Sequence, residues 1–567
     1  MATMASPSRQ VRQRDATGPM PSWDKEADVV VVGSGSAGLA AALTAAVGGA
    51  QVIVLEKAAV LGGTSAMSGA GTWVPANHHM LAAGIADSRE EALAYLRATA
   101  PDGWRDEEDA LWQAFVAHAP DMLRFLEAHT PLEFELVHHP DLYVEAPGGK
   151  LSGRMVSPRP LSRDLAGAWR NRIRSSTLPQ IFTYRELILG TVLSRPIRTL
   201  LKLSPELIHR LLTRSAGMGN ALVVGLLKGC LDRGCEMMAE ACAERLVTDP
   251  DDPMGGRVTG VEAKVGGLTL AIRATRGVVL STGGFEWDPE MLARHFPGEV
   301  GLIGSPRTNT GDGHKMAAAV GARLARMDQA NIYAVTTTVY EGQRHALPLN
   351  ELYHPHCILV NRHGRRFVNE GSPNVGVVLD ARDPASGLPV HLPTWRMFDA
   401  RYADENRLAM WIGRREPGWF RKARTLEELA RLIDLDPAIL RAAVERFNRF
   451  ARNGKDEDFN RGETAWEMFY TRDPARPNQN GALGTIERAP FYAAPYHRGI
   501  LGTKGGPRTN ERGQVLRADG SVIAGLYCAG VAMANPIGTK AVGAGTTIGP
   551  CLTWGYICGQ NLLRENA

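Results

Sequence analysis

Asp28-Val-Val-Val-Val-Gly33-Ser-Gly35-Ser-Ala-Gly38 is the stretch that decides the fold, and Val52-Ile-Val-Leu-Glu56-Lys57 follows it. The pattern predicts a buried strand, a glycine turn, a helix and a second strand that ends on an acidic residue. Gly33 permits the tight turn, Gly35 lets backbone N–H groups reach a pyrophosphate, and Gly38 lets the helix lie close to the sheet. Glu56 is spaced to bind both hydroxyls of an adenosine ribose. We therefore predict a dinucleotide site, because a glycine-rich turn of another α/β protein does not explain Glu56.

The composition is that of a globular protein with more than one core. The chain has 567 residues, of which 44% are hydrophobic, and this length exceeds one ordinary domain, so two domains are expected. The 64 basic and 60 acidic residues leave a formal net charge of +4. This charge is too small to indicate a nucleic-acid partner, and the arginines form no long basic run.

The N-terminus and the cysteines give further expectations. Residues 1–24 are rich in Ser, Pro, Arg and Gln, which predicts a disordered segment and no signal peptide. No stretch reaches the ~18 apolar residues of a membrane-spanning helix. Cys230 and Cys235 are spaced CxxxxC without a matching second pair, so we expect no zinc or other metal site. Seven cysteines, an odd number, favour reduced thiols and a cytoplasmic location.

Apolar periodicity gives a coarse order of elements. Residues 306–497 differ in texture from the rest, with short strands and turns, and suggest a second domain. The predicted elements are helices over 87–130, within 178–213, over 220–245 and over 425–452, a hairpin over 258–273, strands at 277–282 and 525–530, and a last helix after Gly545.

Six motifs follow one another in a fixed order. After the opening glycine motif come Gly62-Gly-Thr64-Ser65, Ser281-Thr-Gly-Gly-Phe-Glu286, Thr310-Gly-Asp312-Gly, Gly364-Arg-Arg-Phe-Val-Asn-Glu370 and Gly543-Ala-Gly-Thr-Thr-Ile-Gly-Pro550. From about residue 25 to residue 562 the chain resembles the fumarate reductase/3-ketosteroid dehydrogenase family of FAD flavoproteins. Gly502-Thr-Lys504-Gly-Gly, Gly284-Phe-Glu286 and Thr547-Ile-Gly-Pro550 most resemble the 3-ketosteroid dehydrogenase branch.

The resemblance implies an α/β fold with two parts. One part is a Rossmann-like FAD-binding domain of the GR2 type with a mixed sheet, formed by residues 25–305 and 498–567. The other is an inserted α+β capping domain of residues 306–497. The flavin should lie between them, so the substrate should bind at their interface.

The resemblance also assigns the cofactor site. Thr64-Ser65-Ala66 lacks the histidine that carries the flavin in members with a covalent cofactor, so FAD should be held non-covalently. A helix beginning after Gly545 would place its N-terminus at the flavin N1/O2 edge, where negative charge develops. The residues implied for FAD are Gly33, Ser34, Gly35, Ala37, Gly38, Glu56, Lys57, Gly63, Thr64, Ser65, Gly283, Gly284, Asp312, Gly530, Gly545, Thr546, Thr547 and Ile548.

The implied chemistry acts on a CH–CH bond next to a ketone, in a cyclic or steroid-like apolar substrate. It needs a donor to the ketone oxygen, a base for the α-proton and an acceptor for the β-hydride. In the ketosteroid branch, tyrosines supply the donor and move the proton. Here Ala541 and Asn374 stand at two of the three tyrosine positions. Tyr143, one place out of register, is the candidate for the third, and the Gly545 N–H is retained as a donor.

Other polar residues are candidates to replace these tyrosines. Lys540 in the last glycine turn either polarises a carbonyl, pairs with a carboxylate or is simply solvated. Tyr353 and His354 precede the strand at 357–360, and His497 lies at the return from the cap. Histidines at these places either shuttle protons or have a structural role.

Several alternatives stay open. A fumarate-reductase-like enoate reductase would clamp carboxylates with arginines; the last turn has Lys540 but no Arg, although Arg498 and Arg508 are near in sequence. A flavin-dependent alcohol or amine oxidase and a catalytically lapsed flavin-binding protein are further options. An external electron acceptor or donor is expected. Residues 178–213, an amphipathic insertion relative to smaller members, either pack on the FAD-binding domain, line a substrate entrance or contact a membrane surface.

Overall fold

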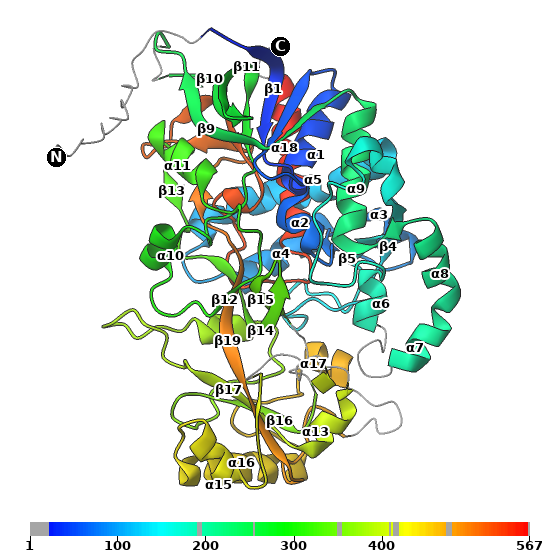
Figure 1. Cartoon of the computed structure of the whole chain (residues 1–567), viewed down its shortest axis with the longest axis vertical. Helices are drawn as coiled ribbons and strands as arrows, with labels where there is room; N and C mark the ends of the chain where they lie inside the picture. The colour runs from blue at the N-terminus through cyan, green and yellow to red at the C-terminus, as the bar shows by residue number, and fades with distance from the viewer. Residues whose placement is uncertain are drawn as a thin grey trace, which may run out of the picture.

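The computed structural model describes residues 22–189, 196–252, 256–348, 354–407, 410–411, 419–471 and 479–564. Figure 1 shows a chain built around two large sheets, one in the upper part and one in the lower part. The upper sheet has eight strands and the lower sheet has seven. Helices cover the upper sheet, and the seven-stranded sheet connects to it through the long strand β19 (Phe491–Thr503).

The upper sheet contains the predicted opening unit. β1 (Lys25–Val32) pairs in parallel with β2 (Val52–Glu56) on one side and with β11 (Leu268–Leu280) on the other. The sheet order is β21-β22-β11-β1-β2-β8. β10 pairs antiparallel with β11, and β9 pairs antiparallel with β10, so the sheet is mixed as expected. The remaining bounds are β21 (Gln514–Leu516), β22 (Val522–Cys528), β8 (Glu236–Ala239), β9 (Ala241–Thr248) and β10 (Val258–Val265).

Two helices from opposite ends of the chain lie side by side against this sheet. α1 (Ser36–Val47) packs along α18 (Ile548–Arg564), and α9 (Met218–Asp232) lies beside α1. A Cβ on Gly555 of α18 would lie 2.2 Å from the carbonyl oxygen of Ala37, so only glycine allows this approach. The valines of β1 read as a continuous apolar run because strands of a covered parallel sheet are buried on both faces.

The second sheet has the order β15-β14-β19-β17-β16, with β12 and β18 also paired to β19. β12 and the end of β19 belong to the second sheet, although their residues lie in the part expected to form the FAD-binding domain, before 305/306 and after 497/498. Gly313 lies in the part expected to form the capping domain, but its N–H donates to Thr282 Oγ1 next to the upper sheet (3.2 Å). The two-domain division therefore stays a prediction. The bounds are β12 (Leu302–Ile303), β14 (Ala330–Tyr340), β15 (Gln343–Pro348), β16 (Cys357–Val360), β17 (Thr394–Phe398) and β18 (Arg421–Ala423).

Two predicted helices differ from the structure. The helix expected over 220–245 ends at Asp232, and strands β8 and β9 follow, because Gly234 turns the chain with φ +76°. The helix expected over 425–452 is two helices, α15 (Leu426–Leu432) and α16 (Pro437–Asn453), since Asp434 has φ +54° and Pro437 begins the second helix.

The other helices and short strands complete the architecture. The segment 87–130 forms α4 and α5 as predicted, the described residues of 178–213 include α6, α7 and α8, and 258–273 forms a hairpin. No described helix has the length and apolar character needed to cross a bilayer. The bounds are α2 (Gly63–Met67), β3 (Thr72–Trp73), α3 (His78–Ala82), α4 (Arg89–Thr99), α5 (Arg105–His129), β4 (Phe134–Leu136), β5 (Met155–Pro158), β6 (Leu161–Ser162), a 3₁₀ helix (Arg163–Trp169), α6 (Tyr184–Leu189), α7 (Pro196–Lys202), α8 (Ser204–Leu212), β7 (Ser215–Ala216), α10 (Pro289–His295), α11 (Asp312–Ala319), β13 (Leu324–Ala325), α12 (Val375–Leu379), α13 (Ala400–Glu405), α17 (Ala465–Thr471), β20 (Gly506–Pro507) and a 3₁₀ helix (Gly530–Ala532).

Candidate functional site

A cleft opens where β1 and β2 end and the glycine turn leads into α1. This is the carboxyl end of the parallel strands, where open α/β sheets bind their ligands. The predicted cofactor residues that line the cleft are Gly33, Ser34, Gly35, Ala37, Glu56, Lys57, Gly63, Thr64, Ser65, Gly283, Asp312 and Gly530.

The three glycines of the opening turn have different roles. A Cβ on Gly33, whose φ is +107°, would lie 2.4 Å from Ser281 O, and one on Gly38 would lie 2.1 Å from Gly33 O. Both glycines are therefore required by the packing of the protein itself. A Cβ on Gly35 would have Ser65 Oγ as its nearest neighbour, at 3.7 Å. Gly35 thus leaves free space at the N-terminus of α1, which fits a pyrophosphate held by backbone N–H groups.

The side chains at the end of β2 are held in place. Glu56 accepts hydrogen bonds from Ser34 N–H (3.2 Å), Ser34 Oγ (2.5 Å) and Ala58 N–H (2.9 Å). Lys57 Nζ donates to Thr310 Oγ1 (2.6 Å) and to Asp312 Oδ2 (2.7 Å). The ion pair connects β2 to the Thr310-Gly-Asp312 motif and forms one wall of the cleft.

Gly38 and Gly284 were also predicted to bind the cofactor, but they pack beneath the residues that line the cleft and do not line it themselves. A Cβ on Gly284 would lie 2.2 Å from the fully buried Glu286 carboxylate. Glu286 accepts from Asn309 Nδ2 (2.7 Å) and from Thr503 N–H (3.0 Å), so it positions Asn309, which does line the cleft. The sequence reasoning missed Asn309 and the small residues Ala241, Ala243 and Ser281 of the wall, because only the fold brings them to the turn.

The last glycine turn forms a second part of the site. Gly545 has φ +94°, and a Cβ there would lie 2.5 Å from Gly71 O. Its carbonyl accepts from Trp73 N–H (3.2 Å), and Thr547 Oγ1 accepts from Asn331 Nδ2 (3.1 Å). The turn therefore lies between the segment before α3 and strand β14 of the second sheet, and it leads into α18 as predicted.

Both positions at which the sequence departs from the family tyrosines meet beside this turn. Asn374 Nδ2 donates to Tyr143 Oη (2.6 Å) and to Ala541 O (2.9 Å), and its Oδ1 accepts from Ala541 N–H (3.1 Å). Tyr143 Oη accepts in this bond, so its own proton remains to be donated. Burial raises the pKa of Tyr143, which keeps that proton on at neutral pH, although the Asn374 bond opposes the shift.

Lys540 completes this group of side chains. Its Nζ lies 4.8 Å from the centroid of the Tyr143 ring. It forms no ion pair with any residue that the structure describes. The structure places Lys540 and Tyr143 together beside the last glycine turn, and their chemical roles stay predictions.

The other predicted catalytic residues are not joined to the turn by any contact between described residues. The ring of His354 lies 6.2 Å from that of Tyr402, and its carbonyl accepts from Arg461 Nη2 (2.8 Å). His497 of β19 is paired with Val335, and burial lowers its pKa while Glu299 opposes this. Tyr353 lies outside the described residues.

Two tyrosines that sequence reasoning missed lie at the site. The ring of Tyr184 packs on the loop before β3, because Cβ atoms on Gly69 and Gly71 would lie 2.4 and 2.8 Å from it. Tyr333 follows Asn331 by two residues on β14, so it shares the strand face that meets Thr547. Its side chain is 38% exposed. The sequence carried no signal for them, since one lies in the 178–213 insertion and the other in an ordinary strand.

The hydroxyls of Tyr184 and Tyr333 share an electrostatic environment. Burial raises the pKa of both, and the neighbouring Tyr333 raises that of Tyr184 further. Neither side chain forms a hydrogen bond with another residue within the described ranges. Both are therefore protonated at neutral pH, and neither hydroxyl is bonded to a described residue.

Lys504 makes stability depend on pH. It is fully buried, its Nζ donates to Gly538 O (2.6 Å), and burial lowers the pKa of its ammonium group to about 8. Unfolded lysine has a pKa of about 10.4, so between these values the unfolded state binds more protons and stability rises with pH. Between pH 8 and 9.5 we expect this group to add about 1.6 kcal/mol to the unfolding free energy of the FAD-loaded protein. Denaturant unfolding of the protein and of Lys504→Met at both pH values measures this, and an equal rise in both would contradict it.

Comparisons with known proteins agree with this geometry. The model of the FAD binding domain family matches residues 28–548. The chain is 37% identical over 556 residues to the 4-oxocyclohexanecarboxylate 2-dehydrogenase of Sinomonas cyclohexanicum, covering 95% of this chain and 93% of that protein. It is 35% identical over 569 residues to the 3-oxosteroid 1-dehydrogenase of Mycolicibacterium smegmatis, covering 96% of this chain and 98% of that protein.

A solved structure shows the same fold. The structure of the 3-ketosteroid delta1-dehydrogenase from Sterolibacterium denitrificans, in complex with 1,4-androstadiene-3,17-dione, matches with a TM-score of 0.86 and 32% identity. The match covers 95% of this chain and 100% of that one. The resemblance, the fold class and the cofactor expected from the sequence are thereby confirmed. The chain belongs to the family of FAD-dependent oxidoreductases that share this FAD binding domain and act on CH–CH bonds.

Proposed function

We propose that the protein dehydrogenates a cyclic ketone between the carbons α and β to its carbonyl. In this reaction the α-carbon loses a proton, the β-carbon loses a hydride, and a C=C bond forms between them. FAD, when bound, supplies the acceptor for the hydride, and the electrons then pass to an external acceptor. The observation that carries the proposal is the Tyr143 hydroxyl, with an uncommitted proton, at the Gly545 turn.

The residues of the turn have separable roles in this proposal. Tyr143 Oη and the Gly545 N–H donate hydrogen bonds to the ketone oxygen and stabilise the negative charge that develops there. Asn374 is a positioning residue, because it holds both Tyr143 and the backbone of Ala541. Tyr184 and Tyr333 are the candidates for moving the α-proton. His354, His497 and Tyr353 remain weaker candidates for that role.

A ring that carries a carboxylate is the substrate that Lys540 favours. Among the described residues Lys540 has no ion-pair partner. Its ammonium group lies beside Tyr143, in the turn that is proposed to bind the ketone, and is placed to pair with an anion. A relative at 37% identity is a 4-oxocyclohexanecarboxylate 2-dehydrogenase, whose name describes a ring keto acid. The second candidate is an uncharged 3-oxosteroid, supported by the 3-oxosteroid 1-dehydrogenases at 35% identity.

Anaerobic mixing of the FAD-loaded protein with saturated ketones tests the function. Bleaching of the oxidised flavin band by 4-oxocyclohexanecarboxylate or by a saturated 3-oxosteroid supports the dehydrogenase. Bleaching only by alcohols or amines would identify an oxidase instead, and reoxidation of reduced flavin only by fumarate would identify an enoate reductase. No bleaching by a ligand that binds would indicate a lapsed enzyme. Acid precipitation should release the flavin into the supernatant, as expected for non-covalent FAD.

We also infer that α7 and α8 contact an anionic membrane surface. Leu203 and Leu207 face inward and pack near Phe182 and Met218. The outer face carries an apolar patch, defined as Leu200, Leu201, Ile208, Leu211 and Leu212, whose side chains are 44–79% exposed. Lys202 and Arg214 are exposed beside it. Figure 1 shows both helices at the right-hand edge of the molecule. An amphipathic helix at an edge can lie in a membrane interface.

Co-sedimentation with anionic lipid vesicles measures this contact. We expect Leu201→Ser with Leu212→Ser to lower the bound fraction about 10-fold, because two exposed leucines lose their transfer into the interface. The matched control is Leu151→Ser with Leu268→Ser, which changes leucines that are 70% and 69% exposed elsewhere. Equal binding of both double variants would end the membrane hypothesis. An effect on the KM of an apolar ketone alone would favour a substrate entrance.

A further inference from the structure

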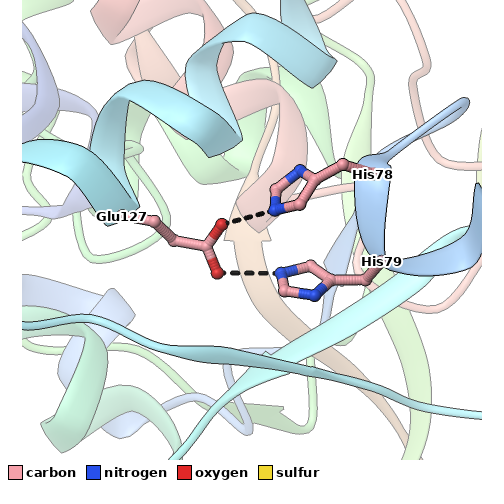
Figure 2. A group of neighbouring side chains, drawn as sticks. All are labelled: His78, His79 and Glu127. Atoms are coloured by element: carbon pink, nitrogen blue, oxygen red, sulfur yellow. Dashed lines mark hydrogen bonds and ion pairs between the residues drawn. The ribbon is translucent and has the colours of Figure 1, made fainter. Parts of the chain in front are cut away.

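Two neighbouring histidines of α3 converge on one carboxylate of α5 (Figure 2). His78 Nε2 lies 2.8 Å from Glu127 Oε2, and His79 Nε2 lies 2.8 Å from Glu127 Oε1. The two imidazole centroids are 4.1 Å apart. One ligand atom from each of the three side chains lies within 4.8 Å of the others, and no second such group was found among the described residues.

The surrounding structure holds these side chains in place. Asn77 caps α3 by accepting from Met80 N–H (2.9 Å), and its Nδ2 donates to the carbonyls of Val74 and Gly153 (2.8 Å each). Phe134 N–H donates to Glu127 Oε1 (3.1 Å) and fixes the orientation of the carboxylate. Bonds of this kind around a ligand set keep it oriented toward an ion.

The chemistry of the three groups suits a late first-row transition metal. Imidazole nitrogen and carboxylate oxygen are ligands of zinc, and three protein ligands with a water in the fourth position form a known tetrahedral arrangement. Ligand atoms about 2.0–2.1 Å from a tetrahedral ion are about 3.3 Å apart. The two 2.8 Å contacts use different oxygens of Glu127, so on binding one oxygen becomes the ligand. The three ligand atoms, which now lie within 4.8 Å of one another, then move to about 3.3 Å apart. The side chains are 19–32% exposed, so an ion can enter from solvent.

We propose that His78, His79 and Glu127 bind a divalent zinc ion, with water as the fourth ligand. The ion would join α3 to α5. α3 follows β3, whose Trp73 N–H binds the Gly545 carbonyl, so the ion stabilises the wall behind the last glycine turn. The cysteine spacing gives no indication of zinc, and the signal in the sequence is the adjacent His78-His79 pair.

Isothermal titration calorimetry of the untagged, FAD-loaded, EDTA-treated protein with zinc chloride tests the proposal. We expect one ion per chain and a rise in Tm on binding. Glu127→Gln keeps the side-chain size and a hydrogen bond but removes the charge, and His79→Ala removes one ligand. Each variant should weaken zinc binding at least 10-fold and abolish the Tm rise.

The matched control is His138→Ala, which removes an exposed histidine that lies outside the three proposed ligands and hydrogen-bonds Ser152. It should bind zinc as the parent does. Absence of zinc binding in the parent, or unchanged affinity and stoichiometry in both Glu127→Gln and His79→Ala, would overturn the proposal. Comparison of the metal-free Tm values shows that each variant is folded.

Discussion

Gly35→Val should give a folded protein that no longer holds FAD. The backbone of Gly35 has φ −67° and ψ 175°, values that valine adopts readily, so the substitution introduces no backbone strain. The nearest protein atom to the new Cβ is 3.7 Å away, so the side chain enters the open cleft at the N-terminus of α1. There it occupies the space through which the pyrophosphate reaches the backbone N–H groups. We expect FAD affinity to fall at least 100-fold, or about 2.7 kcal/mol, with the Tm of the apoprotein unchanged.

Gly38→Ala is the matched contrast. Its Cβ would lie 2.1 Å from Gly33 O and 2.5 Å from Ser281 Oγ, so the clash occurs inside the protein rather than in the cleft. We expect about 1–3 kcal/mol of destabilisation, visible in the apoprotein. Flavin fluorescence titrations and apoprotein melts of both variants separate the two effects. Parent-like FAD binding by Gly35→Val would place the pyrophosphate elsewhere and remove the basis of the cofactor assignment.

Replacing Tyr184 and Tyr333 by phenylalanine should produce the second large effect, a slower reduction of the flavin. Tyr184 and Tyr333 have raised pKa values and form no hydrogen bond with another described residue, so a ligand is the expected partner of at least one hydroxyl. If one of them takes the α-proton, its replacement by phenylalanine should slow single-turnover flavin reduction by 10²- to 10⁴-fold, the usual contribution of a general base. FAD should stay bound, because neither side chain lines the nucleotide cleft.

The pH profile distinguishes this role from a structural one. A tyrosine with a raised pKa acts as a base only once it is ionised, so the rate of ketone oxidation by the parent should rise with pH through the alkaline range. Tyr184→Phe or Tyr333→Phe, whichever removes the base, should no longer show this rise in rate with pH. Tyr340→Phe is the control, since Tyr340 lies on the same strand β14 but its hydroxyl donates to Ser175 O (3.1 Å). Unchanged rates in Tyr184→Phe, Tyr333→Phe and their combination would assign proton transfer to other groups.

The sequence predicted those parts of the fold that local spacing determines. The opening turn and Glu56 are tied to each other by one strand–helix–strand unit, so the cofactor cradle could be located from residue order alone. The helix expected over 220–245 was wrong at its end because the apolar residues of a strand such as Met237 and Met238 of β8 also fit a helical pattern.

The substrate side of the site could be predicted only in part. Lys540 and Tyr143 were named from their places in motifs, and they do meet. Other features of the site depend on contacts between distant parts of the chain. The position of Tyr333 depends on the register of β14 and β19. The hydrogen bonds of Asn374 with Tyr143 and of Asn309 with Glu286 join loops that are far apart in the sequence. No local pattern encodes such long-range placement.

The pairing of α1 with α18 has a consequence for biogenesis. The strand and helix that complete the packing of the first nucleotide-binding elements, β22 and α18, are separated from them by most of the described chain and are translated much later. The nascent chain therefore exposes an unfinished apolar surface until these two elements emerge, and coenzyme loading must wait for them. Premature stop codons, even late ones, should yield protein that is colourless and prone to degradation.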